Sequence, residues 1–337
     1  MGHRVSTQLG ASTLTLETGS LARQADGAVV VQQGGTVVLV TAVCSATPQQ
    51  RVDIVPLTCD YREKTYAAGK IPGGFFKREG RPTEKEILTS RLIDRPIRPL
   101  FPKGFMHELQ VMAAVLSSDG EYDPDILAVL GASCALRLSS IPFPNALGVV
   151  RVAWLDERWV LNPTYQQLNQ SPIDLTLVGT KAGVLTIEAG LREVPEQQLI
   201  DGIAYGVGQL PTFIAMQEEL VAKAGKPKRT TWTIRQPLPE VVEQVRQCAV
   251  EGLARINEPK KKHERHEAVA TLAQTVTAQV TASGAVTPED AAPEQIRAEP
   301  VTTATPVTLG MPSECGSKAA AFRFRPSHGV EKAGAPL

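Results

Sequence analysis

The spacing of hydrophobic residues predicts a mixture of strands and helices over the first 225 residues. Two β-branched runs, Ala28–Gln32 and Val37–Val43, flank Gln33-Gly34-Gly35, which is typical of a hairpin turn. Further strands are expected at Val52–Leu57, Leu109–Ser117, Gly148–Leu155, Trp159–Leu161, Asp174–Val178 and Val184–Glu188. Helices are expected at Glu84–Arg95, Asp125–Leu138, Glu196–Gly206 and Thr212–Ala224. Strands broken by short helices indicate an α+β fold with a mixed sheet, rather than a doubly wound one.

The helix that is expected to begin at Glu84 has clear boundary signals. Thr83 followed by Glu86 matches a capping box, and Pro96 is expected to end the helix. Arg91 and Arg95 are four residues apart, so they share one face of this helix.

From Pro237 onwards the pattern changes. Apolar residues recur at helical spacing at Val242, Val245, Ala249, Leu253 and Ile256, and again at Val269, Leu272, Val276 and Val280. The lysines at 260–262 are interpreted as a solvated turn between two helices. After about Thr281 the chain is rich in alanine, threonine and proline, which predicts disorder. The expected parts are therefore a domain at 1–225, a helical segment at 226–282 and a disordered tail at 283–337.

Residues 73–101 carry the clearest candidate chemistry. Two aromatic residues, Phe75 and Phe76, lead directly into three cations, and a helix then presents three arginines. The cations are Lys77, Arg78 and Arg81, followed by Arg91, Arg95 and Arg98. A surface that binds single-stranded nucleic acid requires this combination. The bases stack on the rings, at about 1–3 kcal/mol per base, and the cations neutralise the phosphates. The alternative is a hydrophobic loop tip and a helix whose arginines pair with Asp94, Glu84 and Glu86.

Composition narrows these possibilities. The 337 residues have a formal net charge of zero, so affinity for RNA must come from a local patch such as 77–98. No apolar run approaches the length of a membrane span, and Met1-Gly2-His3-Arg4 begins no secretory signal. Five cysteines without a CxxC pair fit reduced thiols of the cytoplasm. The histidines form no ligand spacing, so no metal site is expected from them.

Several long motifs resemble polynucleotide phosphorylase, the bacterial family of phosphorolytic exoribonucleases. They are LETGSLARQADGAVVV (16–31), PLTCDYREKTYAAGKIPGGFF (56–76), SRLIDRPIRPLF (90–101), DPDILAVLGASCALRLSSIPF (123–143) and WVLNPTYQQL (159–168). The resemblance spans residues 12–225. It implies a domain of the RNase PH type, with the ribosomal S5 domain 2-like arrangement, followed by the small helical domain of that family. One departure is Lys77, where the family more often has arginine, whose planar fork can grip a phosphate with two hydrogen bonds.

The resemblance also implies a function. It implies a polyribonucleotide nucleotidyltransferase, which degrades RNA from the 3′ end with inorganic phosphate and Mg²⁺ and releases nucleoside diphosphates in mRNA degradation. The loop with Phe75, Phe76, Lys77, Arg78 and Arg81 is expected to contact single-stranded RNA at the channel of a homotrimeric ring. The helix arginines are expected to support binding of RNA or phosphate. A cytoplasmic protein without membrane attachment is implied, with components of an RNA-degradation complex as possible partners.

In that family, phosphate and metal are bound mainly by a second RNase PH-like half. The corresponding places here read Asp119-Gly120-Glu121-Tyr122-Asp123, with acids where phosphate needs donors, and Asp174 as the sole carboxylate of a metal cluster. No catalytic residue is therefore assigned, and the Mg²⁺ ligands are expected in a missing second half. The expectation is a truncated chain that binds RNA without turnover. The alternatives are an RNA-binding and ring-forming module without turnover, and a gene fragment that folds poorly because it exposes the apolar face normally covered by the second half.

Overall fold

A computed structural model of the chain describes residues 2–9, 12–49, 54–73, 75, 78–234, 239–256 and 261–282. The strands are β1 (His3–Leu9), β2 (Ser12–Thr18), β3 (Gly27–Gln33), β4 (Thr36–Pro48), β5 (Leu57–Glu63), β6 (His107–Ser117), β7 (Gly148–Leu155), β8 (Arg158–Leu161), β9 (Ile173–Thr180) and β10 (Gly183–Leu191). The helices are α1 (Glu84–Ile97), α2 (Pro124–Leu138), α3 (Tyr165–Gln170), α4 (Glu196–Ala224), α5 (Pro239–Ile256) and α6 (Lys262–Ala282), with short 3₁₀ helices η1 (Thr65–Ala68) and η2 (Arg98–Leu100).

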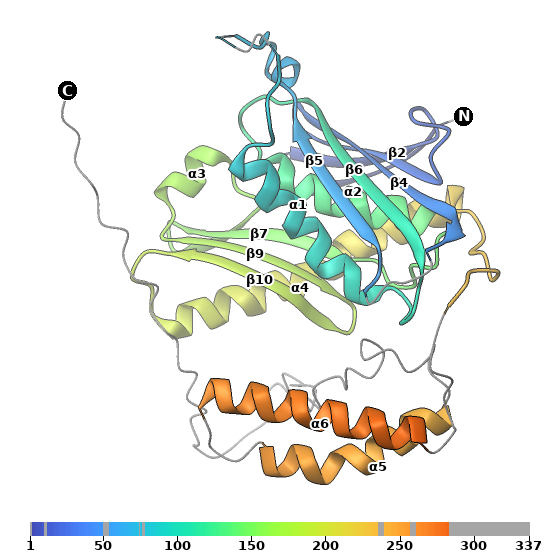
Figure 1. Cartoon of the computed structure of the whole chain (residues 1–337). Helices are drawn as coiled ribbons and strands as arrows, with labels where there is room; N and C mark the ends of the chain where they lie inside the picture. The colour runs from blue at the N-terminus through green and yellow to red at the C-terminus, as the bar shows by residue number, and fades with distance from the viewer. Residues whose placement is uncertain are drawn as a thin grey trace.

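The strands form two sheets (Figure 1). The first has six strands in the order β1-β2-β3-β4-β6-β5, with β5 parallel to β6 and the other neighbours antiparallel. The second has four antiparallel strands in the order β10-β9-β7-β8. This arrangement confirms the predicted α+β class with a mixed sheet.

Helix α2 occupies the centre of the core, where it packs against β3, β4 and β6 of the first sheet, against β7 of the second and against α4. Nearly all of its side chains are buried, so it is apolar all round rather than amphipathic. The helix approaches the first sheet closely at Gly131, where an added Cβ would lie 2.5 Å from Cγ2 of Val40. Glycine at this position is therefore a packing requirement.

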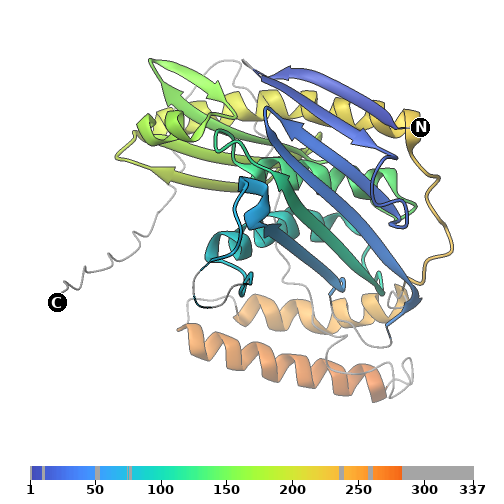
Figure 2. The ribbon, with the colours of Figure 1, turned by 90° about the horizontal axis from the view of Figure 1, so that it is seen from above.

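Helix α4 is continuous, although two helices were predicted here, at Glu196–Gly206 and Thr212–Ala224. Pro211 lies inside it, where proline costs a hydrogen bond. Its neighbours Leu210 and Phe213 are fully buried, and this packing holds the helix together across the proline. Figure 2 shows α4 running alongside both sheets. By length and apolarity alone α4 could cross a membrane, and a third of its most apolar window is buried in this fold; one such helix is weak evidence for a membrane span.

Two further differences concern strands. The strand predicted at Val52–Leu57 is wrong for 54–56, where no strand is present, and Val52 and Asp53 lie outside the described residues; β5 begins at Leu57 and continues to Glu63, with Leu57 and Tyr61 buried. The sequence also did not predict the β1–β2 hairpin, whose inward residues are separated by polar ones. By contrast, the capping box of α1 is confirmed, since Glu86 N–H donates to Thr83 Oγ1 at 3.2 Å and Thr83 N–H to Glu86 Oε2 at 2.6 Å. Pro96 lies in the last turn of α1.

The segment after α4 stays attached to the domain beyond the predicted boundary at 225. Lys228 Nζ donates to the carbonyls of Leu136, Arg137 and Ser139, at 2.8, 3.0 and 2.8 Å, and so caps the C-terminal end of α2. Thr233 N–H donates to His107 Nε2 at 3.0 Å. The attachment therefore extends at least to Thr233, and the division into domains remains a prediction.

Helices α5 and α6 lie side by side in Figures 1 and 2. They pack through a small apolar cluster of their own, made by Ala249 with Val276 and Val280. Both helices fall where helical spacing predicted them. The predicted tail at 283–337 lies outside the described residues, as does Lys260 of the basic run.

Candidate functional site

The loop between η1 and α1 projects from the body of the protein at the top of Figure 1. Phe75 is 95% exposed, and Arg78 and Arg81 are exposed beside it. Phe76 and Lys77, the other two predicted contacts, lie outside the described residues. Phe75 thus lies outside the core, on a loop that also exposes two arginines.

The base of this loop is held in place by Glu79. Its carboxylate accepts from Lys64 Nζ at 2.5 Å and from Thr65 N–H and Oγ1 at 3.0 and 3.1 Å. These hydrogen bonds, that from Lys64 first, lower the pKa of Glu79. The sequence did not single out this anchor, nor Tyr66, which is 57% exposed in η1 at the start of the loop. The sequence signal for both would have been the polar run that follows β5.

The three helix arginines do not act together. Arg91 and Arg95 are exposed on the outer face of α1, and Arg95 Nη1 pairs with Glu188 Oε1 of β10 at 3.3 Å. Arg98 points elsewhere: its guanidinium pairs with Asp94 at 2.5 Å and donates to the carbonyls of Val55 and Leu57. Its contacts fit the structural alternative, whereas Arg91 and Arg95 remain candidates for binding RNA or phosphate.

The same face of α1 and the neighbouring edge strand β10 expose apolar side chains. They are Ile87, Leu88, Leu185, Ile187 and Leu191, between 39% and 58% exposed. β10 lies at the edge of its sheet, with one side unpaired. An apolar edge strand is a template for pairing with another chain. This α1–β10 surface is therefore suited to assembly.

The acids that were predicted to repel phosphate have structural partners. Asp119 accepts from Gly35 N–H at 2.7 Å, from Thr36 Oγ1 at 2.9 Å and from Glu121 N–H at 2.9 Å. Burial opposes its charged form, but these hydrogen bonds outweigh burial and lower the pKa of Asp119. Asp119 therefore fixes the β3–β4 turn.

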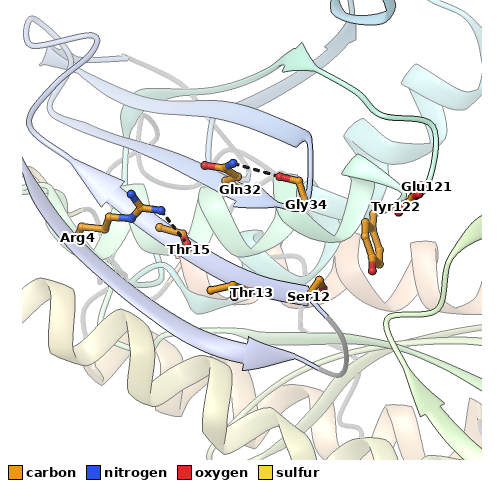
Figure 3. Close-up of a pocket in the computed structure, with 8 residues that line it drawn as sticks. All are labelled: Arg4, Ser12, Thr13, Thr15, Gln32, Gly34, Glu121 and Tyr122. Atoms are coloured by element: carbon orange, nitrogen blue, oxygen red, sulfur yellow. Dashed lines mark hydrogen bonds between the residues drawn. The ribbon is translucent and has the colours of Figure 1, made fainter.

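A shallow hollow of about 630 Å³ lies beside this turn (Figure 3). It is lined by Arg4, Ser12, Thr13, Thr15, Gln32, Gly34, Glu121 and Tyr122. Arg4 is the sole cation of this lining, and its Nη2 donates to Thr15 Oγ1 at 3.4 Å. The lining also includes the acid Glu121, and Arg4 is already bonded to Thr15, so we do not assign the hollow to the candidate RNA surface.

On the other side of the 119–123 loop, three carboxylates surround one arginine. Arg151 of β7 holds Asp174 of β9 through two hydrogen bonds of 2.7 Å, from Nε and Nη2. Its Nη1 lies 3.0 Å from Asp123 Oδ2 and 3.4 Å from Asp125 Oδ2 at the start of α2. Lys85 Nζ of α1 reaches the other oxygen of Asp123 at 3.1 Å.

This carboxylate cluster (Asp123, Asp125 and Asp174) is electrostatically tight. Burial and then the neighbouring Asp123 charge raise the pKa of Asp125 to about 7. Burial alone would lower the pKa of Arg151, but its carboxylate partners, Asp174 foremost, raise it. The sequence indicated Asp123 and Asp174 as acids of interest, but it did not indicate that Asp125, Lys85 and Arg151 join them. A lone arginine inside the apolar run of β7 was the available signal, since a buried charge requires partners.

The Mg²⁺ that the family resemblance implies does not fit this cluster. Among the residues that the structure describes, no three side chains of His, Cys, Asp and Glu are grouped to hold a metal ion. The oxygens that would be ligands are already used by Arg151 and Lys85.

Comparisons of this chain with family models and with individual proteins point to the same family. Residues 12–142 match domain 1 of the 3′ exoribonuclease family (RNase PH), and residues 145–209 match its domain 2. A polyribonucleotide nucleotidyltransferase of Heliobacterium modesticaldum is 48% identical over 274 residues, which are 81% of this chain and 38% of that protein. The enzyme of the same name from Acidobacterium capsulatum is 53% identical over 220 residues, which are 65% of this chain and 27% of that protein. The chain thus spans well under half the length of these relatives.

Among solved structures, rice Rrp46 matches with 17% sequence identity and a TM-score of 0.49, covering 63% of this chain and 95% of that one. Similarity at this level does not bear on function.

Proposed function

The chain belongs to the 3′ exoribonuclease family with RNase PH domains, and we propose that it is the RNA-binding, non-catalytic half of a polyribonucleotide nucleotidyltransferase. The whole enzyme would use inorganic phosphate to attack the last phosphodiester of RNA and release nucleoside diphosphates. Phosphate and Mg²⁺ would be held by the part of such enzymes that this chain does not span. Turnover by this chain alone is therefore not expected.

The single observation that carries the proposal is the exposed loop tip. Phe75 offers a ring for base stacking, and Arg78 and Arg81 offer charges for phosphates next to it. The anchor at Glu79 limits the freedom of the loop before RNA binds, which reduces the entropy lost on binding. Phe76 and Lys77 are proposed contacts on the same loop by sequence.

Arg91 and Arg95 are proposed to support this binding from α1. The apolar α1–β10 surface supports a second role, the formation of a homotrimeric ring, because it presents an unpaired edge strand. A cytoplasmic location without membrane attachment, with components of an RNA-degradation complex as partners, accompanies the proposal. An RNA-binding and ring-forming module without turnover is the alternative function, and the same surface favours its ring-forming part.

The test is binding of a fluorescent oligo(A) to the purified chain. A Phe75→Ala/Phe76→Ala variant should bind about tenfold or more weakly, since each stacked base contributes about 1–3 kcal/mol. Ile54→Ala is the matched control, because Ile54 is also an exposed apolar residue, at 68%, but lies outside the loop. Equal affinity of the three proteins would reject the loop as the binding site and leave the ring-forming module.

A further inference from the structure

The carboxylate cluster joins elements that are far apart in the sequence. Asp123 and Asp125 begin α2, Asp174 lies on β9, and all three meet the guanidinium of Arg151 on β7. Through Asp123 the contacts continue to Lys85 of α1, which also pairs with Glu63 of β5 at 2.8 Å. The network thus links the first sheet, the second sheet and two helices.

The charges in this network explain why a cation must be present. Side chains of Asp123 and Asp125 are only 10% and 13% exposed, so water screens their mutual repulsion poorly. Arg151, at 16% exposure, is the group that contacts all three carboxylates of the cluster. Its planar fork donates to both oxygens of Asp174 along one edge and reaches the other two acids with Nη1. A compact ion could not satisfy groups spread around a guanidinium without moving them.

We propose that the Arg151 guanidinium is the permanent cation of this cluster and replaces a divalent metal ion there. The cluster is then a metal-free joint between the two sheets, and divalent ions neither bind it nor stabilise it. The inference depends on side-chain contacts alone. It stands whether or not the chain binds RNA, because its test contains neither RNA nor phosphate.

The first measurement is thermal unfolding of the full chain in EDTA and in millimolar Mg²⁺ or Mn²⁺. The wild-type melting temperature should be the same in all three. A rise with Mn²⁺ that disappears in Asp125→Asn would place a metal ion at the cluster and overturn the proposal.

The second measurement compares Arg151→Lys with Arg151→Met. Both replacements are long and unbranched, but only lysine keeps the charge. Arg151→Met removes the cation shared by the nearly buried Asp123 and Asp125 and the partly exposed Asp174, and should lower the melting temperature by about 10 °C. Arg151→Lys should lose clearly less, because one ammonium still neutralises part of the cluster. If methionine is tolerated as well as lysine, Arg151 serves packing and the proposal is wrong.

Arg158→Met is the matched control. Arg158 follows on the same β7–β8 hairpin, is 76% exposed and pairs weakly with Asp156, at 3.9 Å. The melting temperature of the Arg158→Met variant should equal that of the wild type. If Arg151→Met does not fold but Arg151→Lys does, this difference shows that folding depends on the positive charge at position 151. If neither folds, Asp174→Asn decides: a lower melting temperature that metal ions do not restore is expected, and restoration by Mn²⁺ would overturn the proposal.

Discussion

The Glu79 carboxylate lies 2.5 Å from Lys64 Nζ, and this contact closes the base of the loop that carries Phe75. Lys64 precedes η1 and Glu79 follows Phe75 within the loop, so this contact joins the two sides of the segment that carries Phe75. A closed base restricts the positions that the tip can take. If the loop binds RNA as proposed, it is therefore partly organised before RNA binds.

Breaking this anchor should weaken RNA binding without unfolding the domain. Glu79→Gln removes the ion pair with Lys64, so the loop must be ordered when RNA binds. The expected result is a fall in oligo(A) affinity of about twofold to fivefold. Glu84→Gln, an exposed acid in the first turn of α1, is the control. If both variants bind as the wild type does, the anchor does not order the loop for RNA.

The arginines of the loop should determine how binding depends on salt. If Arg78 and Arg81 contact phosphates, neutralising both to glutamine should reduce the slope of log K against log salt by about 0.7 for each lost contact. Titrations of oligo(A) at several salt concentrations measure this slope. Arg246→Gln, on exposed α5, should leave it unchanged. An unaltered slope in the double variant would remove these arginines from the RNA surface.

Substitution of Arg91 should affect RNA binding, whereas substitution of Arg98 should affect the stability of the fold. Arg98→Ala removes the ion pair with Asp94 and the side-chain donor to the Leu57 carbonyl, so the free energy of unfolding should fall by about 2 kcal/mol. Arg91→Ala changes an exposed position and should leave stability within about 0.5 kcal/mol. Denaturant unfolding and oligo(A) binding of both variants provide the measurements. Weaker RNA binding by Arg91→Ala at unchanged stability is expected, and the reverse pattern would contradict the assignment.

The raised pKa of Asp125 predicts a pH dependence of stability. This carboxyl titrates at about 7 in the folded protein but at 3.8 as an unperturbed group. The folded state therefore binds the proton more tightly, and the resulting stabilisation is lost as pH rises from about 4 to about 7. Asp125→Asn removes this contribution, so its free energy of unfolding should fall less over that range. Urea unfolding at pH 4.5 and 7 measures the free energy of unfolding of the wild type and of Asp125→Asn. An equal change in both proteins would show that the pKa of Asp125 is not raised.

Local signals predicted much of the fold correctly. The α1 boundary followed from Thr83 and Glu86, and the β3–β4 hairpin from its glycine turn, because these features depend on neighbours in the sequence. The sequence failed where tertiary packing overrides local preference. Two separate helices were predicted at Glu196–Gly206 and Thr212–Ala224, yet the packing of buried Leu210 and Phe213 keeps α4 continuous across Pro211.

The candidate site shows the same limit. The exposed loop tip was evident from adjacent aromatic and basic residues. The carboxylate cluster was not, because Asp123, Arg151 and Asp174 meet only when α2, β7 and β9 pack together. Likewise, the side chain of Arg98 turns from the RNA candidates towards the carbonyl of Leu57, a contact that only the folded chain creates.

The most direct test of the central claim, an RNA-binding half without turnover, is phosphorolysis. Purified chain is mixed with oligo(A), inorganic phosphate and Mg²⁺, ADP release is measured against a phosphate-free control, and retention of the RNA is scored in the same sample. The account predicts no ADP above the control while RNA remains bound. Phosphate-dependent ADP release, absent from a mock preparation, would show that this chain carries a working catalytic site and would contradict the account.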